Sequence, residues 1–284
     1  MLIEELIPVC SDPRVDLFTA RSAGPAERAL LVVHGGPDWD HSYLREPLTD
    51  LAEAHRLVFV DLRGCGRSTT GLPAHEYNAD AVVRDLVTLL DALGISETDV
   101  LGFSTGGLFA QRLAVTAPQR IRRLIVASSS IPPVPPDAYG DWPEAVAVRR
   151  GVSRHRDQNP EPTPELVRAD AIAGIPANVW RDEVRAEYRR RLDAVRFTAD
   201  WCRSTPPGRY PAIRPERSLE RLAKVGLPIL LLHGRQDMTF PAFLAEQTAD
   251  QMPEARAVVL DQAGHMAHID QPEAWRRAVA EFLA

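Results

Sequence analysis

A serine stands between two glycines at the end of an apolar run. Gly102 and Gly106 each lie two residues from Ser104, with the run 99–103 before the turn and a helical pattern over 108–114 after it. A serine on a sharp strand-to-helix turn has a strained backbone, and side chains two positions away would collide across that turn. This G-x-S-x-G spacing predicts a nucleophilic hydroxyl at Ser104. The alternative is an ordinary turn rich in glycine and serine.

Two further residues are placed to activate that hydroxyl. A serine is a poor nucleophile unless a neighbouring base removes its proton. His265, which follows the last predicted strand in an Ala-Gly-His context, is the candidate base, and His268 is its rival. Asp237, after the preceding predicted strand, is the candidate that fixes the imidazole tautomer and stabilises the imidazolium. The alternatives are an exposed loop histidine at position 265 and a turn or helix-capping aspartate at position 237.

The segment His34-Gly35-Gly36-Pro37 offers backbone donors for a developing oxyanion. Gly36 has no side chain, so its N–H can approach a substrate closely. Paired with the N–H of Thr105, it would form an oxyanion hole. Gly35 is the alternative donor, and we expect His34 to hold the loop rather than to act as a second base.

Strands and helices alternate along most of the chain. The predicted strands are 2–9, 14–20, 29–33, 56–60, 99–103, 121–127, 227–232 and 255–260, and predicted helices include 42–54, 78–93, 242–251 and 272–283. The first two strands form an antiparallel hairpin, and the later alternation implies an α/β fold with a mostly parallel eight-stranded sheet and helices on both faces. In such sheets ligands bind at the carboxyl ends of the strands. Ser104, Asp237 and His265 each follow a predicted strand, so we expect them to meet at one edge.

The pattern changes between residues 128 and 218. Prolines cluster there, and short amphipathic helical patterns occur at 142–156, 164–173 and 178–203. This composition predicts a helical cap inserted into a core made of residues 1–127 and 219–284. Acidic residues on the predicted cap helices are candidate ligands for a substrate ammonium group; they are Glu144, Asp182, Glu183 and Glu187. The alternative for each of them is an ordinary solvated helix face.

The bulk composition is that of a globular protein, with 284 residues of which 45% are hydrophobic and 25% charged. The net charge of −6 gives no reason to expect a nucleic acid or an anionic membrane as partner, so we expect a small molecule or a short peptide. Three scattered cysteines have no metal-ligand spacing, which predicts no metal, no other cofactor and a reducing, cytoplasmic compartment. No apolar run reaches the ~18 residues of a membrane span, and the acidic N-terminus lacks the basic region of a signal peptide.

Over nearly its whole length the chain resembles α/β-hydrolases, and among them it is most similar to the proline iminopeptidase family of serine aminopeptidases. The resemblance rests on His34-Gly35-Gly36-Pro37, on Asp61-x-Arg63-Gly64-x-Gly66-x-Ser68, on the turn at Ser104, and on Asp237 and His265 in the order Ser, Asp, His. The chain departs from the family at Asp38, where glycine is usual, and at the turn, where Gly102-Phe103-Ser104-Thr105-Gly106-Gly107 replaces the usual GGSWGG. In that family, cap glutamates bind the free amino terminus of the substrate, a role for which Glu144, Glu183 and Glu187 are the candidates here.

The resemblance implies a serine hydrolase that acts through an acyl-enzyme. The expected activity is that of an aminopeptidase or amidase, which removes an N-terminal aminoacyl group from a peptide or a small-molecule amide. The same triad would serve a carboxylesterase or lactonase on a small ester, with no need for an ammonium site. The complete set of Ser104, Asp237 and His265 disfavours a third class, a ligand-binding protein without catalysis. Epoxide hydrolases and dehalogenases need a carboxylate nucleophile where this chain has Ser104.

Overall fold

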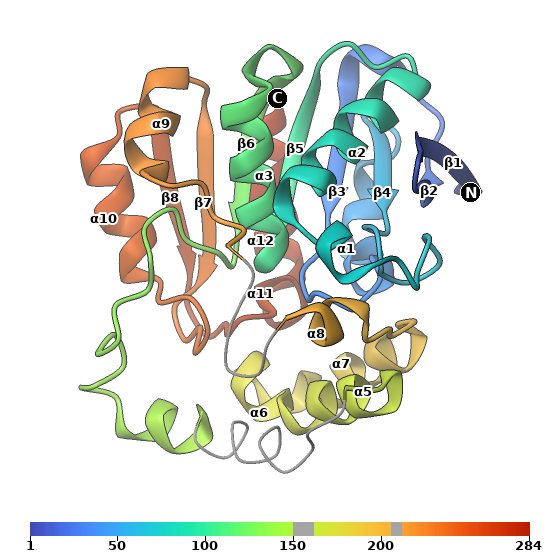
Figure 1. The fold of residues 1–284 in the computed structure, drawn as a ribbon. Coiled ribbons are helices and arrows are strands. Elements are labelled where there is room, and N and C mark those ends of the chain that lie inside the picture. The colour runs from blue at the N-terminus through green and yellow to red at the C-terminus, as the bar shows by residue number, and fades with distance from the viewer. Residues whose placement is uncertain (150–161, 206–211) are drawn as a thin grey trace.

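In the computed structural model, which describes residues 1–149, 162–205 and 212–284, an eight-stranded sheet forms the centre of the fold (Figure 1). The strands are β1 (Ile3–Ser11), β2 (Arg14–Arg21), β3 (Ala29–Val33), β4 (Arg56–Val60), β5 (Thr98–Phe103), β6 (Ile121–Ala127), β7 (Ile229–Gly234) and β8 (Ala255–Leu260). Their spatial order is β1-β2-β4-β3-β5-β6-β7-β8. The pairs β1–β2 and β2–β4 are antiparallel and the remaining neighbours are parallel, so the expected sheet is confirmed.

Helices cover both faces of this sheet. One face carries α2 (Ala79–Ala92), α3 (Thr105–Thr116) and α9 (Ser218–Val225), and the other carries α1 (Arg45–Leu48) and α12 (Pro272–Leu283). A hydrophobic core lies between the sheet and the helices on each face. Neighbouring residues of a strand point to opposite faces, so Leu31 packs into the core on the α2 and α3 side and Leu30 into the core on the α1 and α12 side. The helix α10 (Phe243–Gln251) lies along β7 and β8. Strands β3, β5 and β7 are buried throughout, as parallel strands covered on both sides must be.

The helix predicted at 42–54 is wrong. The chain instead forms a 3-10 turn at Ser42–Leu44, the short α1 at Arg45–Leu48 and a second 3-10 turn at Thr49–Leu51. Pro47 explains the break, because it lacks an N–H and its ring disfavours helical backbone in the residue before it. Glu46 accordingly has the extended angles φ −95° and ψ 134°.

Four helices of the cap, our name for residues 128–218, lie together at the edge of the sheet where the parallel strands end (Figure 1). They are α5 (Pro164–Ala173), α6 (Ile175–Asn178), α7 (Arg185–Ala194) and α8 (Asp200–Ser204). The helix predicted at 164–173 is confirmed. The one predicted at 178–203 is broken, because residues 195–199 bond to the core instead, with the Thr198 N–H donating to the Asp38 carbonyl at 2.9 Å.

Residues 143–149 of the cap are helical, and residues 150–156 of the helix predicted at 142–156 lie outside the described residues. Two large cap side chains, Tyr188 and Trp201, are fully buried. None of the helices in the described parts of the chain combines the length and the apolar character needed to cross a membrane.

Substitution of Gly106 by alanine tests how tightly the turn after β5 is packed. A Cβ at this position would collide with the backbone carbonyls of Val33 and His34, at the end of β3. Gly94 has a left-handed φ of 65° but open space around it, which makes it the matched control. We expect Gly94→Ala to cost about 1–2 kcal/mol for the left-handed backbone, and Gly106→Ala to cost about 3 kcal/mol or more for the collision. Chemical denaturation measures both free energies of unfolding, and equal costs would contradict this description of the turn.

Candidate active site

Ser104 occupies a strained turn between β5 and α3. Its backbone angles are φ 53° and ψ −123°, which a residue with a side chain seldom adopts. A Cβ at Gly102 would lie 2.5 Å from the Gly106 carbonyl oxygen, so the close packing across the turn needs glycine. The Ser104 N–H donates to the Ala127 carbonyl of β6 at 2.8 Å, which fixes the turn to the sheet. The result is a hydroxyl held at the carboxyl end of the central strand.

Three buried side chains form a continuous chain of hydrogen bonds at this turn. Ser104 Oγ lies 3.0 Å from His265 Nε2, and His265 Nδ1 lies 2.9 Å from Asp237 Oδ2. A carboxylate can only accept, so Nδ1 carries the proton and Nε2 faces the hydroxyl as an acceptor. Asp237 Oδ1 accepts the backbone N–H groups of Thr239 at 2.7 Å and Phe240 at 2.9 Å, which orient the carboxylate. The structure thus brings the three predicted residues into one hydrogen-bonded set.

The loop after β3 lies directly against Ser104. A Cβ on Gly35 would be 2.8 Å from Ser104 Cβ. The Gly35 N–H donates to the Tyr43 hydroxyl at 2.8 Å, so this alternative oxyanion donor is occupied. Within the described residues the N–H groups of Gly36 and Thr105 have no hydrogen-bond partner, and Thr105 is the first residue of α3, where the N–H has no carbonyl of its own helix to reach. These two N–H groups are therefore the available candidates for the oxyanion hole.

His34 holds this loop, as the sequence suggested. Its Nε2 accepts the Leu62 N–H at 3.1 Å, and its Nδ1 donates to the Gly35 carbonyl at 2.6 Å. Burial lowers the pKa of His34 below its ordinary value, which keeps the ring neutral and able to accept at Nε2. Both nitrogens are thus committed to the loop.

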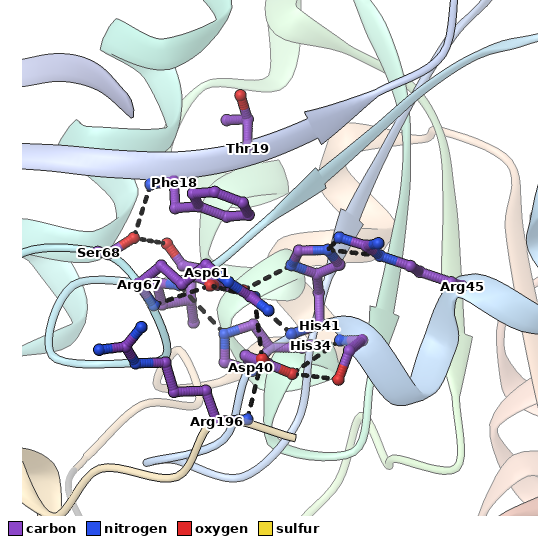
Figure 2. Close-up of polar contacts among 12 residues, drawn as sticks. Phe18, Thr19, His34, Asp40, His41, Arg45, Asp61, Arg67, Ser68 and Arg196 are labelled. Atoms are coloured by element: carbon purple, nitrogen blue, oxygen red, sulfur yellow. Dashed lines mark hydrogen bonds and ion pairs between the residues drawn. The ribbon is translucent and has the colours of Figure 1, made fainter. Parts of the chain in front are cut away.

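A buried polar network supports the far end of the same loop (Figure 2). Asp61 Oδ1 accepts from His41 Nδ1 at 2.5 Å, and Asp61 Oδ2 accepts the Arg67 backbone N–H at 3.0 Å. Asp40 Oδ2 accepts from Arg67 Nη1 at 3.1 Å and from the backbone N–H of Arg196, a cap residue, at 3.0 Å. Burial alone would raise the pKa of Asp61, but the hydrogen bond and charge of His41 hold it below its usual value. The segment 61–68 therefore fastens the loop after β3, and Asp40 of that loop binds the cap.

Sequence reasoning missed Asp270, which positions the loop of His265. The Asp270 side chain is buried, and its carboxylate accepts the backbone N–H groups of Gly264 at 2.8 Å, Trp180 at 3.0 Å and Arg181 at 2.9 Å. Burial raises the pKa of Asp270, and these hydrogen bonds offset part of the rise. Two of the donors belong to the cap, so Asp270 ties the His265 loop to the cap. Its local sequence gives no sign of this, because those donors lie about 90 positions away.

The rival base, His268, has a different role. Its Nε2 donates to the Tyr43 carbonyl at 3.2 Å, and its ring packs in the core against Phe103 and Trp275. Its Nδ1 has no hydrogen-bond partner in the part of the chain that the structure describes. Burial drives the pKa of His268 well below its ordinary value, so the ring stays neutral. His268 is a core residue, and His265 alone of the two contacts the serine.

The cap carboxylates expected to bind an ammonium group face arginine side chains or solvent. Glu183 pairs with Arg181, Glu187 with Arg190 and Arg191, and Asp182 with Arg185, while Glu144 is exposed. A carboxylate that is already paired with arginine is a poor receptor for a second cation. The structure therefore brings none of the four into contact with the triad.

Other nucleophiles and metal ligands are poorly placed in the described residues. Burial raises the pKa of the Cys65 thiol well above its ordinary value, which leaves it protonated and unreactive near neutral pH. The same residues contain no group of three or more His, Cys, Asp and Glu side chains that could hold a metal ion. Ser104 is the best activated nucleophile that the described chain provides.

Comparison with known proteins identifies the family. A family model described as the alpha/beta hydrolase fold matches residues 28–272. The chain is 30% identical over 263 residues to a 2-hydroxymuconate semialdehyde hydrolase from Pseudomonas sp. (strain CF600), a match that covers 90% of this chain and 86% of that protein. It is similar to the structure of an esterase from Thermogutta terrifontis, with a TM-score of 0.73, 25% identity and coverage of 100% of this chain and 98% of that one. A proline iminopeptidase from Mycobacterium smegmatis shares the fold, with a TM-score of 0.70, 22% identity and coverage of 99% and 97%. The chain therefore belongs to the alpha/beta hydrolase family, and a proline iminopeptidase is among the solved structures that share its fold.

Proposed function

We propose that this protein is a serine hydrolase that cleaves small neutral esters through an acyl-enzyme on Ser104. The observation that carries the proposal is the chain of hydrogen bonds from Ser104 through His265 to Asp237, next to two N–H groups that have no partner among the described residues. Such an arrangement supplies a nucleophile, a base, an orienting carboxylate and oxyanion donors within one site.

The reaction has two halves. Ser104 Oγ attacks the carbonyl carbon of the ester while its proton passes to His265 Nε2. The N–H groups of Gly36 and Thr105 stabilise the negative charge on the carbonyl oxygen, and Asp237 stabilises the imidazolium. The bond to the alcohol then breaks, and His265 protonates the departing oxygen. In the second half His265 Nε2 takes a proton from water while the water oxygen attacks the acyl carbonyl carbon. The bond between that carbon and Ser104 Oγ then breaks, the carboxylic acid leaves, and His265 returns the proton to Ser104 Oγ.

The surroundings of His265 favour a substrate without a charged amine. The Phe240 ring stacks on the His265 ring with centroids 6.1 Å apart, and the Phe103 ring lies 5.4 Å away. Arg149 of the cap donates to the carbonyl of Met238, next to the triad aspartate, so the cap brings a positive charge to this loop. The acidic residues of the cap that could attract an ammonium group are paired with arginine or exposed. Apolar rings and a guanidinium group suit a neutral acyl group better than an aminoacyl group.

An aminopeptidase of the proline iminopeptidase type is the second candidate. The motifs at 34–37 and 61–68 favour it. It requires a carboxylate that binds the substrate ammonium group in a desolvated site. Glu187 of α7 is the least exposed of the acidic candidates, and it would have to give up its ion pairs with Arg190 and Arg191.

Ser104→Ala should reduce kcat for a short-chain aryl ester by about 10⁴-fold or more, because binding and oxyanion contacts alone leave only residual catalysis. The far-UV circular dichroism spectrum should be unchanged, since the substitution removes a single oxygen atom. A fluorophosphonate should label the wild type and leave the variant unlabelled. An alanine variant with turnover near that of the wild type would refute the proposed function.

His265→Gln and His268→Gln form a matched pair that separates the two histidines. His265→Gln removes the base and should lower kcat by about 10⁴-fold or more, with little change in KM. His268→Gln should leave kcat nearly unchanged and lower the melting temperature, because it removes a ring from the core. Steady-state kinetics and thermal melts measure both effects, and the reverse pattern of activities would assign the base to His268.

Substrates that differ by one charged amine decide between the two candidate functions. We expect p-nitrophenyl butyrate to be the best substrate, and alanine p-nitroanilide and its N-acetylated form to be cleaved at similar, lower rates. A bound ammonium–carboxylate pair contributes up to about 3 kcal/mol, which corresponds to a preference of roughly 100-fold for the free amine. A preference of that size in kcat/KM would establish the aminopeptidase and rule out the ester proposal.

A further inference from the structure

Asp38 is a fully buried carboxylate that the proposed mechanism does not use. It directly follows the segment 34–37, which carries the candidate oxyanion donor Gly36. Its backbone has a left-handed φ of 67°, a conformation that costs glycine less than aspartate. An aspartate held in this conformation therefore requires an explanation in its side chain.

The Asp38 carboxylate binds the cap segment 197–202. Oδ1 accepts the Trp201 backbone N–H at 3.0 Å, and Oδ2 accepts the Cys202 backbone N–H at 2.9 Å. The Thr198 hydroxyl shares its proton between the Gly64 carbonyl at 2.6 Å and Asp38 Oδ1 at 3.2 Å. The residue before α8 makes no capping hydrogen bond with its own side chain. Asp38 thus supplies, from a distant part of the chain, the acceptors that the first N–H groups of α8 need.

An aromatic contact joins the same two segments. The Trp39 ring lies edge-on to the Phe197 ring of the cap, with centroids 5.3 Å apart. A Cβ on Gly36 would lie 3.1 Å from the Trp39 ring, so that ring rests against the residue whose N–H is the oxyanion donor. Trp39 also packs edge-on against Tyr43, whose hydroxyl accepts the Gly35 N–H. The residues on both sides of Gly36 are therefore held in place, and on one side the cap holds them.

We propose that Asp38 is a positioning residue: its carboxylate couples the cap segment 197–202 to the loop 34–39, so that the placement of the cap sets the position of the Gly36 N–H relative to Ser104. This inference rests on the proposed function. It follows that loss of the carboxylate weakens stabilisation of the transition state more than binding of the substrate, because the oxyanion donor acts as charge develops.

Three variants test this coupling. Asp38→Asn keeps the shape but turns an amide group toward one of the N–H donors, and Asp38→Gly suits the backbone but removes every side-chain bond. Tyr77→Phe is the matched control, because it removes a 2.6 Å hydrogen bond from the Tyr77 hydroxyl to Asp200, which fastens the same helix α8 to the core. That bond does not involve the loop 34–39.

Both Asp38 variants should lower kcat for a short aryl ester by about tenfold to 100-fold, with KM nearly unchanged, because a small displacement of a catalytic group has effects of this size. Asp38→Gly should lower kcat more than Asp38→Asn does, because it removes every side-chain bond. The Ki of an aryl trifluoromethyl ketone, whose hemiketal oxygen occupies the oxyanion hole, should rise by the same factor. Tyr77→Phe should lower the melting temperature and leave kcat and this Ki unchanged. Thr198→Val removes the hydroxyl that bridges Asp38 and the Gly64 carbonyl. It should give a smaller change in kcat and Ki of the same kind, even where the Asp38 variants do not fold.

The result that would overturn the inference is a lower melting temperature in the Asp38 and Thr198 variants with kcat and Ki unchanged, because Asp38 would then only stabilise the fold. An effect confined to KM would also overturn it. Activity retained by Ser104→Ala would instead contradict the proposed function, so a failure of this inference can be distinguished from a failure of the proposed function.

Discussion

The hydrogen bond between Ser104 Oγ and His265 Nε2 joins residues 161 positions apart, and the architecture of the site fixes both of its ends. At one end, the strained turn between β5 and α3 holds the serine above the sheet, and close packing around Gly102 and Gly106 leaves that turn no room to relax. At the other end, Asp237 orients the imidazole and Asp270 anchors its loop. The parallel sheet brings Ser104 and His265 together, because the carboxyl ends of its strands lie at one edge.

Buried carboxylates hold the loops that regular secondary structure does not. A buried charge is costly unless hydrogen bonds satisfy it. Asp61, Asp270 and Asp38 are all buried, and each accepts bonds from backbone N–H groups. These acceptors define where the loops run. Asp270 binds the cap on the side of His265, and Asp38 binds it on the side of Gly36, so the cap is joined to the core on both sides of Ser104.

Most of the sheet could be predicted from sequence because short, continuous apolar runs are typical of strands buried on both faces. The meeting of Ser104, Asp237 and His265 could be predicted because each of them follows such a run. Local sequence patterns gave wrong or incomplete predictions where a hydrogen-bond partner lies far away in the chain or where a proline changes the backbone geometry. Pro47 broke a predicted helix through its missing N–H, and two of the three N–H groups that donate to Asp270 belong to a cap segment far away in the chain. Arginines at helical spacing, three and four residues after Glu187, pair with a carboxylate that appeared available in sequence.

Mass spectrometry of an acid-quenched reaction tests the central claim most directly. During turnover of an aryl ester, the acyl group should appear on the tryptic peptide 85–112, which contains Ser104, and fragmentation should place it on that serine. Its occupancy should rise within the first turnover, together with a burst of released phenol, and fall as the substrate is consumed. An enzyme that turns over while this peptide stays unmodified, or one acylated at another residue, would contradict the account.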